Sequence, residues 1–111
     1  MYDTQSELDR MCRGIRDELV KLATRINSDD FDGTYTDDDG DEMDVADMFL
    51  EVVNERGRNF ALVSCIGGPH IETEWVNNYA TVEGYWGGDR VSLPLDQETA
   101  NTLNDYFFLD Y

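Results

Sequence analysis

The fold is decided by residues 70–94, HIETEWVNNYATVEGYWGGDRVSLP, in which apolar and polar side chains alternate. Alternation with a period of two is typical of a strand that buries one face. Asn77-Asn78 and Gly87-Gly88 interrupt the pattern and are typical of hairpin turns. Val91 and Leu93 then continue the alternation. This stretch therefore predicts three antiparallel strands.

Upstream of it, residues 59–66, NFALVSCI, form an apolar run that predicts a further strand covered on both faces, followed by a Gly67-Gly68-Pro69 turn. Residues 59–94 are thus expected to form a four-stranded antiparallel meander. One face of this sheet is apolar. Its other face is expected to carry acidic and aromatic side chains, namely Glu72, Glu74, Glu83, Tyr79 and Tyr85.

Helices are expected before and after this sheet in the sequence. Apolar residues recur at three- and four-residue steps from Leu8 to Ile26, which predicts a long helix over 5–27, with Thr4 and Glu7 as its capping box. A C-terminal helix over 96–109 begins at Asp96. Residues 27–44 are expected to be mostly loop, with a short strand around 34–36. The prediction is a single α+β domain over 1–111.

Residues 45–56, VADMFLEVVNER, fit two structures. Their valines and phenylalanine suit a strand. A helix is favoured, because Asp47, Glu51 and Glu55 would then share one face at four-residue steps, with Asp44 as the N-cap. We therefore expect an acidic loop and helix over 29–55.

Charge is unevenly distributed along the chain. The formal net charge is −17, from 25 acidic and 8 basic residues. Residues 1–26 hold five of each sign, whereas residues 27–111 hold twenty acids against three arginines. Such a field repels nucleic acid and anionic lipid and attracts basic protein surfaces. The expected partner is therefore the basic groove of a nucleic-acid-binding protein, with no direct contact to nucleic acid or to a membrane.

The acids themselves are spaced like charges on a nucleic acid. Twelve of them lie between residues 29 and 55 with no Lys or Arg among them. Carboxylates four residues apart on a helix lie roughly 6 Å apart, and alternate residues on a strand about 7 Å. Rows of this kind can stand in for phosphates. The expected partner-binding residues are Asp37, Asp38, Asp39, Asp41, Glu42, Asp44, Asp47, Glu51, Glu55, Glu72, Glu74 and Glu83.

Other site chemistries find little support in the sequence. Asp37, Asp39 and Asp41 alternate as in a calcium-binding EF-hand loop, but Glu42 stands where that loop needs glycine. His70 is the only histidine, and no recognisable triad surrounds it. Cys12 and Cys65 are expected to be buried free thiols, with a disulfide between them as the alternative. We expect no catalytic residue, no metal ligand and no cofactor.

In size, concentrated acid and lack of catalytic residues, the chain resembles small acidic inhibitors made by phages and other mobile elements, such as anti-CRISPR and anti-restriction DNA-mimic proteins. The segments GGPHIETEW and VEGYWGGDRVSLPL, followed by an aromatic helix, are also similar to small proteins of bacterial mobile elements. This resemblance implies an inhibitor that occupies the nucleic-acid-binding groove of a defence nuclease, with a CRISPR effector nuclease as the expected target.

Three alternatives stay open. The aromatic C-terminal helix would serve an adaptor that binds a partner, or a homodimer contact. Clustered carboxylates would serve a divalent-cation-binding module. Halophilic adaptation would explain the charge without any partner. No apolar run approaches the roughly 20 residues of a membrane span, and the N-terminus does not resemble a signal peptide. The expected location is the cytoplasm, that of the host if the chain is phage-encoded.

Overall fold

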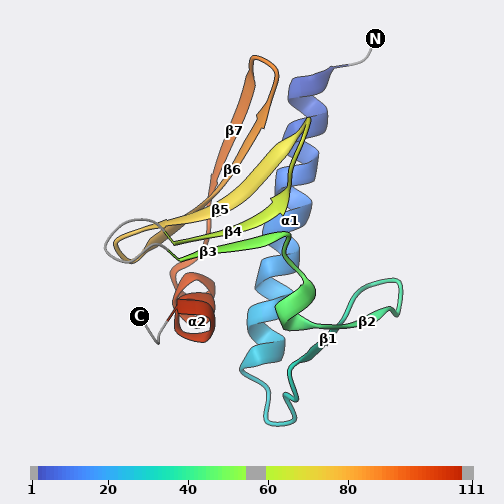
Figure 1. Ribbon diagram of the computed structural model, residues 1–111, viewed down its shortest axis with the longest axis vertical. Coiled ribbons are helices and arrows are strands. Elements are labelled where there is room, and N and C mark those ends of the chain that lie inside the picture. The colour runs from blue at the N-terminus through green and yellow to red at the C-terminus, as the bar shows by residue number, and fades with distance from the viewer. Residues whose placement is uncertain (1–2, 55–59, 109–111) are drawn as a thin grey trace.

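The computed structural model describes residues 3–54 and 60–108 and has an α+β fold. Figure 1 shows a long helix running beside a curved sheet, with a second helix across its end. The elements in chain order are α1 (Thr4–Ile26), β1 (Thr34–Thr36), β2 (Glu42–Asp44), the 3-10 helix η1 (Val45–Asp47), β3 (Glu51–Asn54), β4 (Phe60–Cys65), β5 (His70–Val76), β6 (Tyr79–Trp86), β7 (Asp89–Pro94) and α2 (Gln97–Phe108).

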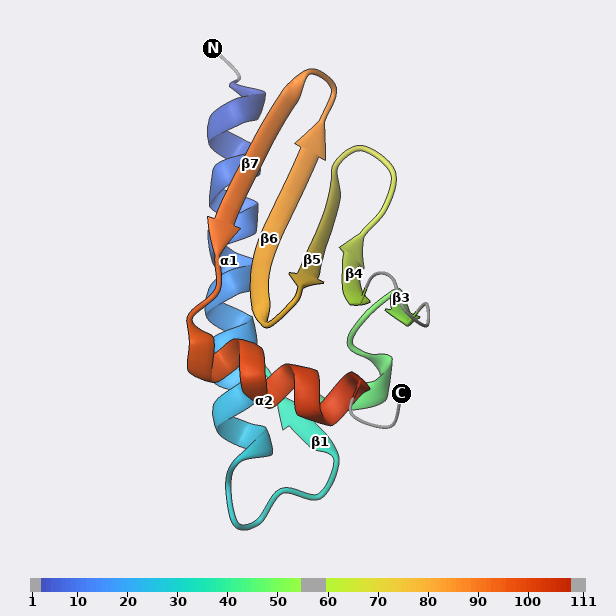
Figure 2. The same cartoon turned by 90° about the vertical axis from the view of Figure 1, so that its left-hand side faces the viewer.

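The main sheet has five antiparallel strands in the order β3-β4-β5-β6-β7, so each strand pairs with its neighbour in sequence. In Figure 2 these strands run side by side in front of α1, with α2 below their lower ends. The meander over 59–94 is confirmed as antiparallel, but the prediction of four strands is wrong. The fifth strand, β3, comes from the segment expected to be a helix.

The helix expected over 45–56 is replaced by η1 and β3. Val52 pairs with Leu62 and Val53 with Ala61 on the neighbouring strand β4. The valines, which lose side-chain freedom in a helix, instead extend the sheet. Pairing with the next strand, β4, decided between the two structures that the local pattern allowed. The short strand expected around 34–36 is confirmed as β1, which forms a separate two-stranded sheet with β2.

Helix α1 carries the expected apolar stripe, but its N-cap is Asp3 and not Thr4. The Asp3 side chain accepts hydrogen bonds from the backbone N–H groups of Gln5 and Ser6 at 3.1 and 3.4 Å. Thr4 is the first helical residue, and its hydroxyl donates to Asp89 on β7. The buried stripe faces the sheet and consists of Leu8, Cys12, Leu19, Leu22 and Ala23.

Helix α2 closes one end of the core. The backbone N–H of Thr99 donates to the Asp96 carboxylate at 3.0 Å, so the predicted cap at Asp96 is confirmed. The indole N–H of Trp75 donates to the carbonyl of Ala100 at 3.1 Å, and the Trp75 ring meets Phe108 edge-on at 5.4 Å. These contacts fix α2 against β5.

Cys12 and Cys65 are both free thiols. Cys12 is fully buried, and burial raises the pKa of its thiol to about 11, with the nearby carboxylates of Asp9 and Glu83 adding to the effect. No helix among the described residues is both long enough and apolar enough to cross a membrane.

Candidate acidic binding surface

The densest acidic segment folds into the β1–β2 hairpin. The turn between the strands is held by Asp37, whose Oδ1 accepts hydrogen bonds from the backbone N–H groups of Asp39 and Asp41, both at 2.9 Å. Gly40 supplies the left-handed backbone conformation that the turn needs, with φ at +86°. The Asp37 carboxylate is therefore engaged in building the turn.

Two cations of α1 anchor this hairpin and the loop that leads to it. Lys21 Nζ lies 2.8 Å from Oδ2 of Asp38. The Arg25 guanidinium lies 2.9 Å from Asp30 and 3.1 Å from Asp32. The hydrogen bond from Lys21 to Asp38 raises the pKa of the lysine. The charge of Asp38 is thus compensated from within the chain.

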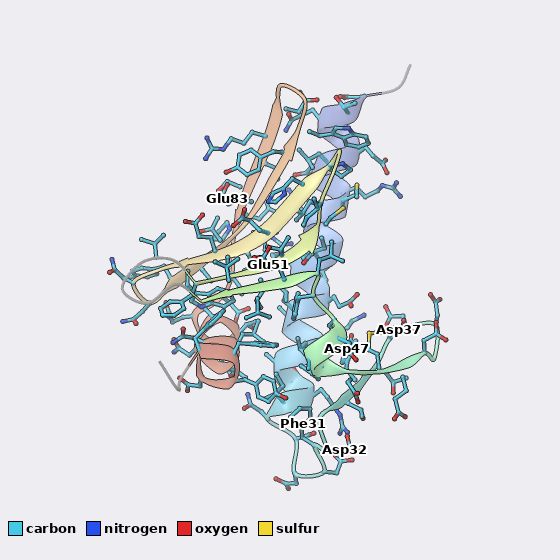
Figure 3. All side chains as sticks on the ribbon, viewed as in Figure 1. Phe31, Asp32, Asp37, Asp47, Glu51 and Glu83 are labelled. Carbon is cyan, nitrogen blue, oxygen red and sulfur yellow. The ribbon has the colours of Figure 1, made fainter. Side chains whose placement is uncertain are left out.

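The remaining acids of the segment have no such partner. We call Asp39, Asp41, Glu42, Asp44 and Asp47 the hairpin acids. All five are exposed. Within residues 3–54 and 60–108, their carboxylates take part in no hydrogen bond or ion pair. Figure 3 shows Asp37 and Asp47 on the same side of the lower half of α1, away from Glu83.

A second set of acids lies on the sheet. Cross-strand partners share a face, so a row runs from Glu51 through Val63 to Glu72 and Glu83. Glu74 lies on the same face one step along β5. We call Glu51, Glu72, Glu74 and Glu83 the sheet acids, and the side that carries them the open face. This is the face turned away from α1, toward the viewer in Figure 2.

Glu72, Glu74 and Glu83 are less exposed than the hairpin acids, whereas Glu51 is as exposed as they are. Only 27% of the Glu72 side chain and 14% of the Glu83 side chain is accessible. His70 Nε2 lies 2.8 Å from Oε1 of Glu72. The hydroxyl of Ser92 donates to Oε1 of Glu83 at 3.0 Å, whereas the buried Oε2 of Glu83 has no hydrogen-bond partner among the described residues.

The structure therefore divides the expected site in two. Asp37 holds the hairpin turn and Asp38 pairs with Lys21 of α1, the hairpin acids form one surface, and the sheet acids form another. Glu51 was expected on a helix face with Asp47 and Glu55, but it lies on β3 and belongs to the sheet acids. Glu55 falls outside the described residues. Glu72 and Glu74 lie on β5 and Glu83 lies on β6, as strand residues of the kind expected.

Two polar residues of the open face were missed by the sequence interpretation. Arg90 and Ser92 lie on β7, opposite Tyr85 and Glu83. The alternation with Val91 and Leu93 contained the signal, because inward-pointing residues at 91 and 93 place 90 and 92 outward.

Every described cation is already paired with an acid of the same chain. The six Lys and Arg residues within 3–54 and 60–108 all lie within 4 Å of a carboxylate, the longest separation being 3.9 Å for Arg90 and Glu83. The pairs are Arg10–Glu7, Arg13–Asp9, Arg16–Asp17, Lys21–Asp38, Arg25 with Asp30 and Asp32, and Arg90–Glu83. This part of the chain thus offers no unpaired cation to a phosphate.

Two shallow cavities lie elsewhere. One, of about 190 Å³, is lined by Ile15, Glu18, Leu19, Met48, Phe49 and Ser64. The other, of about 360 Å³, lies between α1 and the start of α2. Among the described residues, no group of three or more His, Cys, Asp or Glu side chains is placed to hold a metal ion.

Comparisons with protein-family models, with curated proteins and with solved structures returned no match.

Proposed function

We propose that this protein binds the basic, nucleic-acid-binding surface of another protein and blocks it by charge mimicry. One observation carries the proposal: five exposed hairpin acids have no cation among the described residues, while all six described cations are already paired. The cations of a Lys- or Arg-lined groove would form ion pairs with these carboxylates and be attracted to them over long range.

The hairpin suits this task because it is presented rigidly. Tyr35 on β1 is buried against the core, Arg25 Nε donates to the carbonyl of Thr34 at 3.0 Å, and the backbone N–H of Val45 donates to the carbonyl of Gly33 at 2.9 Å. Carboxylates held on a fixed backbone lose less conformational freedom when a partner binds.

The adaptor alternative has less surface to use. Phe107 packs edge-on against Phe49, and Phe108 packs against Trp75 and Phe60. Tyr106 is partly exposed, yet its ring packs against Phe31. The described aromatic residues of α2 thus pack against residues of the same chain, and Leu109 and Tyr111 lie outside the described residues.

The narrower proposal, which follows the resemblance to phage-encoded inhibitors, is inhibition of a defence nuclease in the cytoplasm. A CRISPR effector nuclease is the first target to assay. Titrating the protein against a guide-loaded effector should abolish DNA cleavage at about one molecule per nuclease. Loading the nuclease with DNA beforehand should protect it, because the two ligands compete for one groove.

If DNA loaded beforehand does not protect the nuclease, the inhibitor acts at another step, and the mimicry mechanism is ruled out. Undiminished cleavage would remove that nuclease as the target. The broader proposal is tested separately, by whether duplex DNA displaces the basic proteins that this protein captures from a bacterial lysate.

A further inference from the structure

We propose that the open face binds an arginine side chain of the basic partner, between Glu83, Glu72 and the ring of Tyr85, and that Arg90 holds this position until the partner displaces it. The inference deepens the proposed function, on which it rests. It names arginine, not lysine, as the chemistry recognised on the sheet.

The two carboxylates of this position face each other. Glu72 and Glu83 are direct cross-strand partners on β5 and β6. Like charges placed opposite each other on a sheet destabilise it unless a cation lies between them. His70 and Ser92 each satisfy one oxygen, but the buried Oε2 of Glu83 accepts no hydrogen bond from any described residue. This oxygen is an acceptor without a donor, and because it is buried, an incoming donor reaches it only after neighbouring side chains such as Arg90 move.

Arg90 shows which kind of cation fits. Its guanidinium carbon lies 5.3 Å from the centre of the Tyr85 ring, within the range of a cation–π contact. Its Nη2 lies 3.9 Å from Oε2 of Glu83, which is too long for a hydrogen bond. With 67% of its side chain exposed, Arg90 stacks on the ring but does not hydrogen-bond the Glu83 carboxylate. Its hold on the position is weak, as is usual for exposed pairs.

An incoming arginine can stack on the Tyr85 ring and hydrogen-bond the Glu83 carboxylate at the same time. The planar guanidinium donates two parallel N–H groups to a carboxylate while its face lies against an aromatic ring, whereas a lysine ammonium offers a point charge only. Nearly inaccessible Ala61 and Val63 share the open face by register and lower the polarity around the carboxylates. Electrostatic attraction is stronger in such surroundings than in water.

The test compares nona-arginine with nona-lysine peptides, which carry equal charge, by calorimetry on the whole chain at fixed salt. The wild type should bind nona-arginine about tenfold more tightly. Tyr85→Leu and Glu83→Gln should each remove this preference. Glu98→Gln, an exposed acid on α2, removes the same charge as Glu83→Gln and should keep the preference. Melting curves confirm that each variant is folded.

Arg90→Gln provides a gain-of-binding test. Arg90→Gln should tighten nona-arginine binding about fivefold more than Arg10→Gln does. The Arg10→Gln variant is the control, because it removes an equal charge from α1 and leaves Arg90 in place. Equal tightening by the two variants would overturn the role of Arg90. Equal affinity of the wild type for both peptides, or a preference that survives Tyr85→Leu and Glu83→Gln, would overturn the arginine site but leave charge-based binding intact. Binding of neither peptide would overturn the proposed function as well.

Discussion

At the residue scale, Gly84 on β6 is where α1 comes closest to the sheet. A Cβ at this position would lie 2.5 Å from Sγ of Cys12 and 3.0 Å from Cδ1 of Leu8, both fully buried. Gly84→Ala should therefore lower the free energy of unfolding by about 1–3 kcal/mol, because overpacking forces the helix away from the strand.

Gly88→Ala is the matched control, since a Cβ there meets nothing within 4 Å. It should change the stability by no more than about 0.5 kcal/mol. Urea unfolding measures both. A Gly84→Ala protein as stable as the control would mean that α1 does not pack on β6 as described.

Thr73 is the second residue with a specific consequence. Its side chain is fully buried on β5, and its hydroxyl has no hydrogen-bond partner among the described residues. Thr73→Val replaces the unsatisfied hydroxyl with a methyl group of similar size. We expect it to raise the free energy of unfolding by about 1 kcal/mol, measured by urea unfolding. A loss of stability instead would show that the hydroxyl is hydrogen-bonded.

At the element scale, Asp96 makes the start of α2 dependent on pH. The hydrogen bond from the backbone N–H of Thr99 lowers the pKa of this carboxyl in the folded protein. Its stabilisation is therefore complete above the unfolded pKa of about 4, and is lost as the pH falls through the folded pKa. Asp96→Ala should cost about 1 kcal/mol at neutral pH, and the difference from wild type should shrink in acid.

Asp105→Ala on the same helix is the control, because Asp105 is exposed and caps nothing. Thermal melts at neutral and acidic pH measure both variants. A cost for Asp96→Ala that stays constant down to the lowest pH would show that the ionised cap does not hold the helix.

The elements also show what the sequence could predict. Strands β5 to β7 were predicted because alternation and turn residues are local signals. Strand β3 was missed because its identity depends on pairing with β4, and residues 51–53 fit a helical stripe equally well. The division of the acids was missed for a similar reason. The pairing of Lys21 with Asp38 across 17 residues is a tertiary contact, so the sequence could not show which carboxylates remain free.

At the scale of the whole molecule, the 25 acids behind the net charge of −17 are not equally available to a partner. Most acids of α1 pair with neighbouring cations, Asp30, Asp32 and Asp38 pair with α1, and the hairpin acids and sheet acids lie on two separate surfaces. Halophilic adaptation requires acid on exposed surface but not this arrangement. The two explanations differ in whether the position of the charge matters or only its amount.

The most direct measurement of the central claim is therefore capture of basic proteins from a bacterial lysate by two charge-matched variants. In one, Asp39, Asp41, Glu42 and Asp47 become Lys. In the other, the exposed acids Asp17, Glu18, Glu98 and Asp105 become Lys. Mass spectrometry quantifies the nucleic-acid-binding proteins that duplex DNA displaces from each. The account predicts that the first variant loses these proteins and that the second, which has the same net charge, retains them. Melting curves check that both variants are folded. Equal capture by both variants would contradict it.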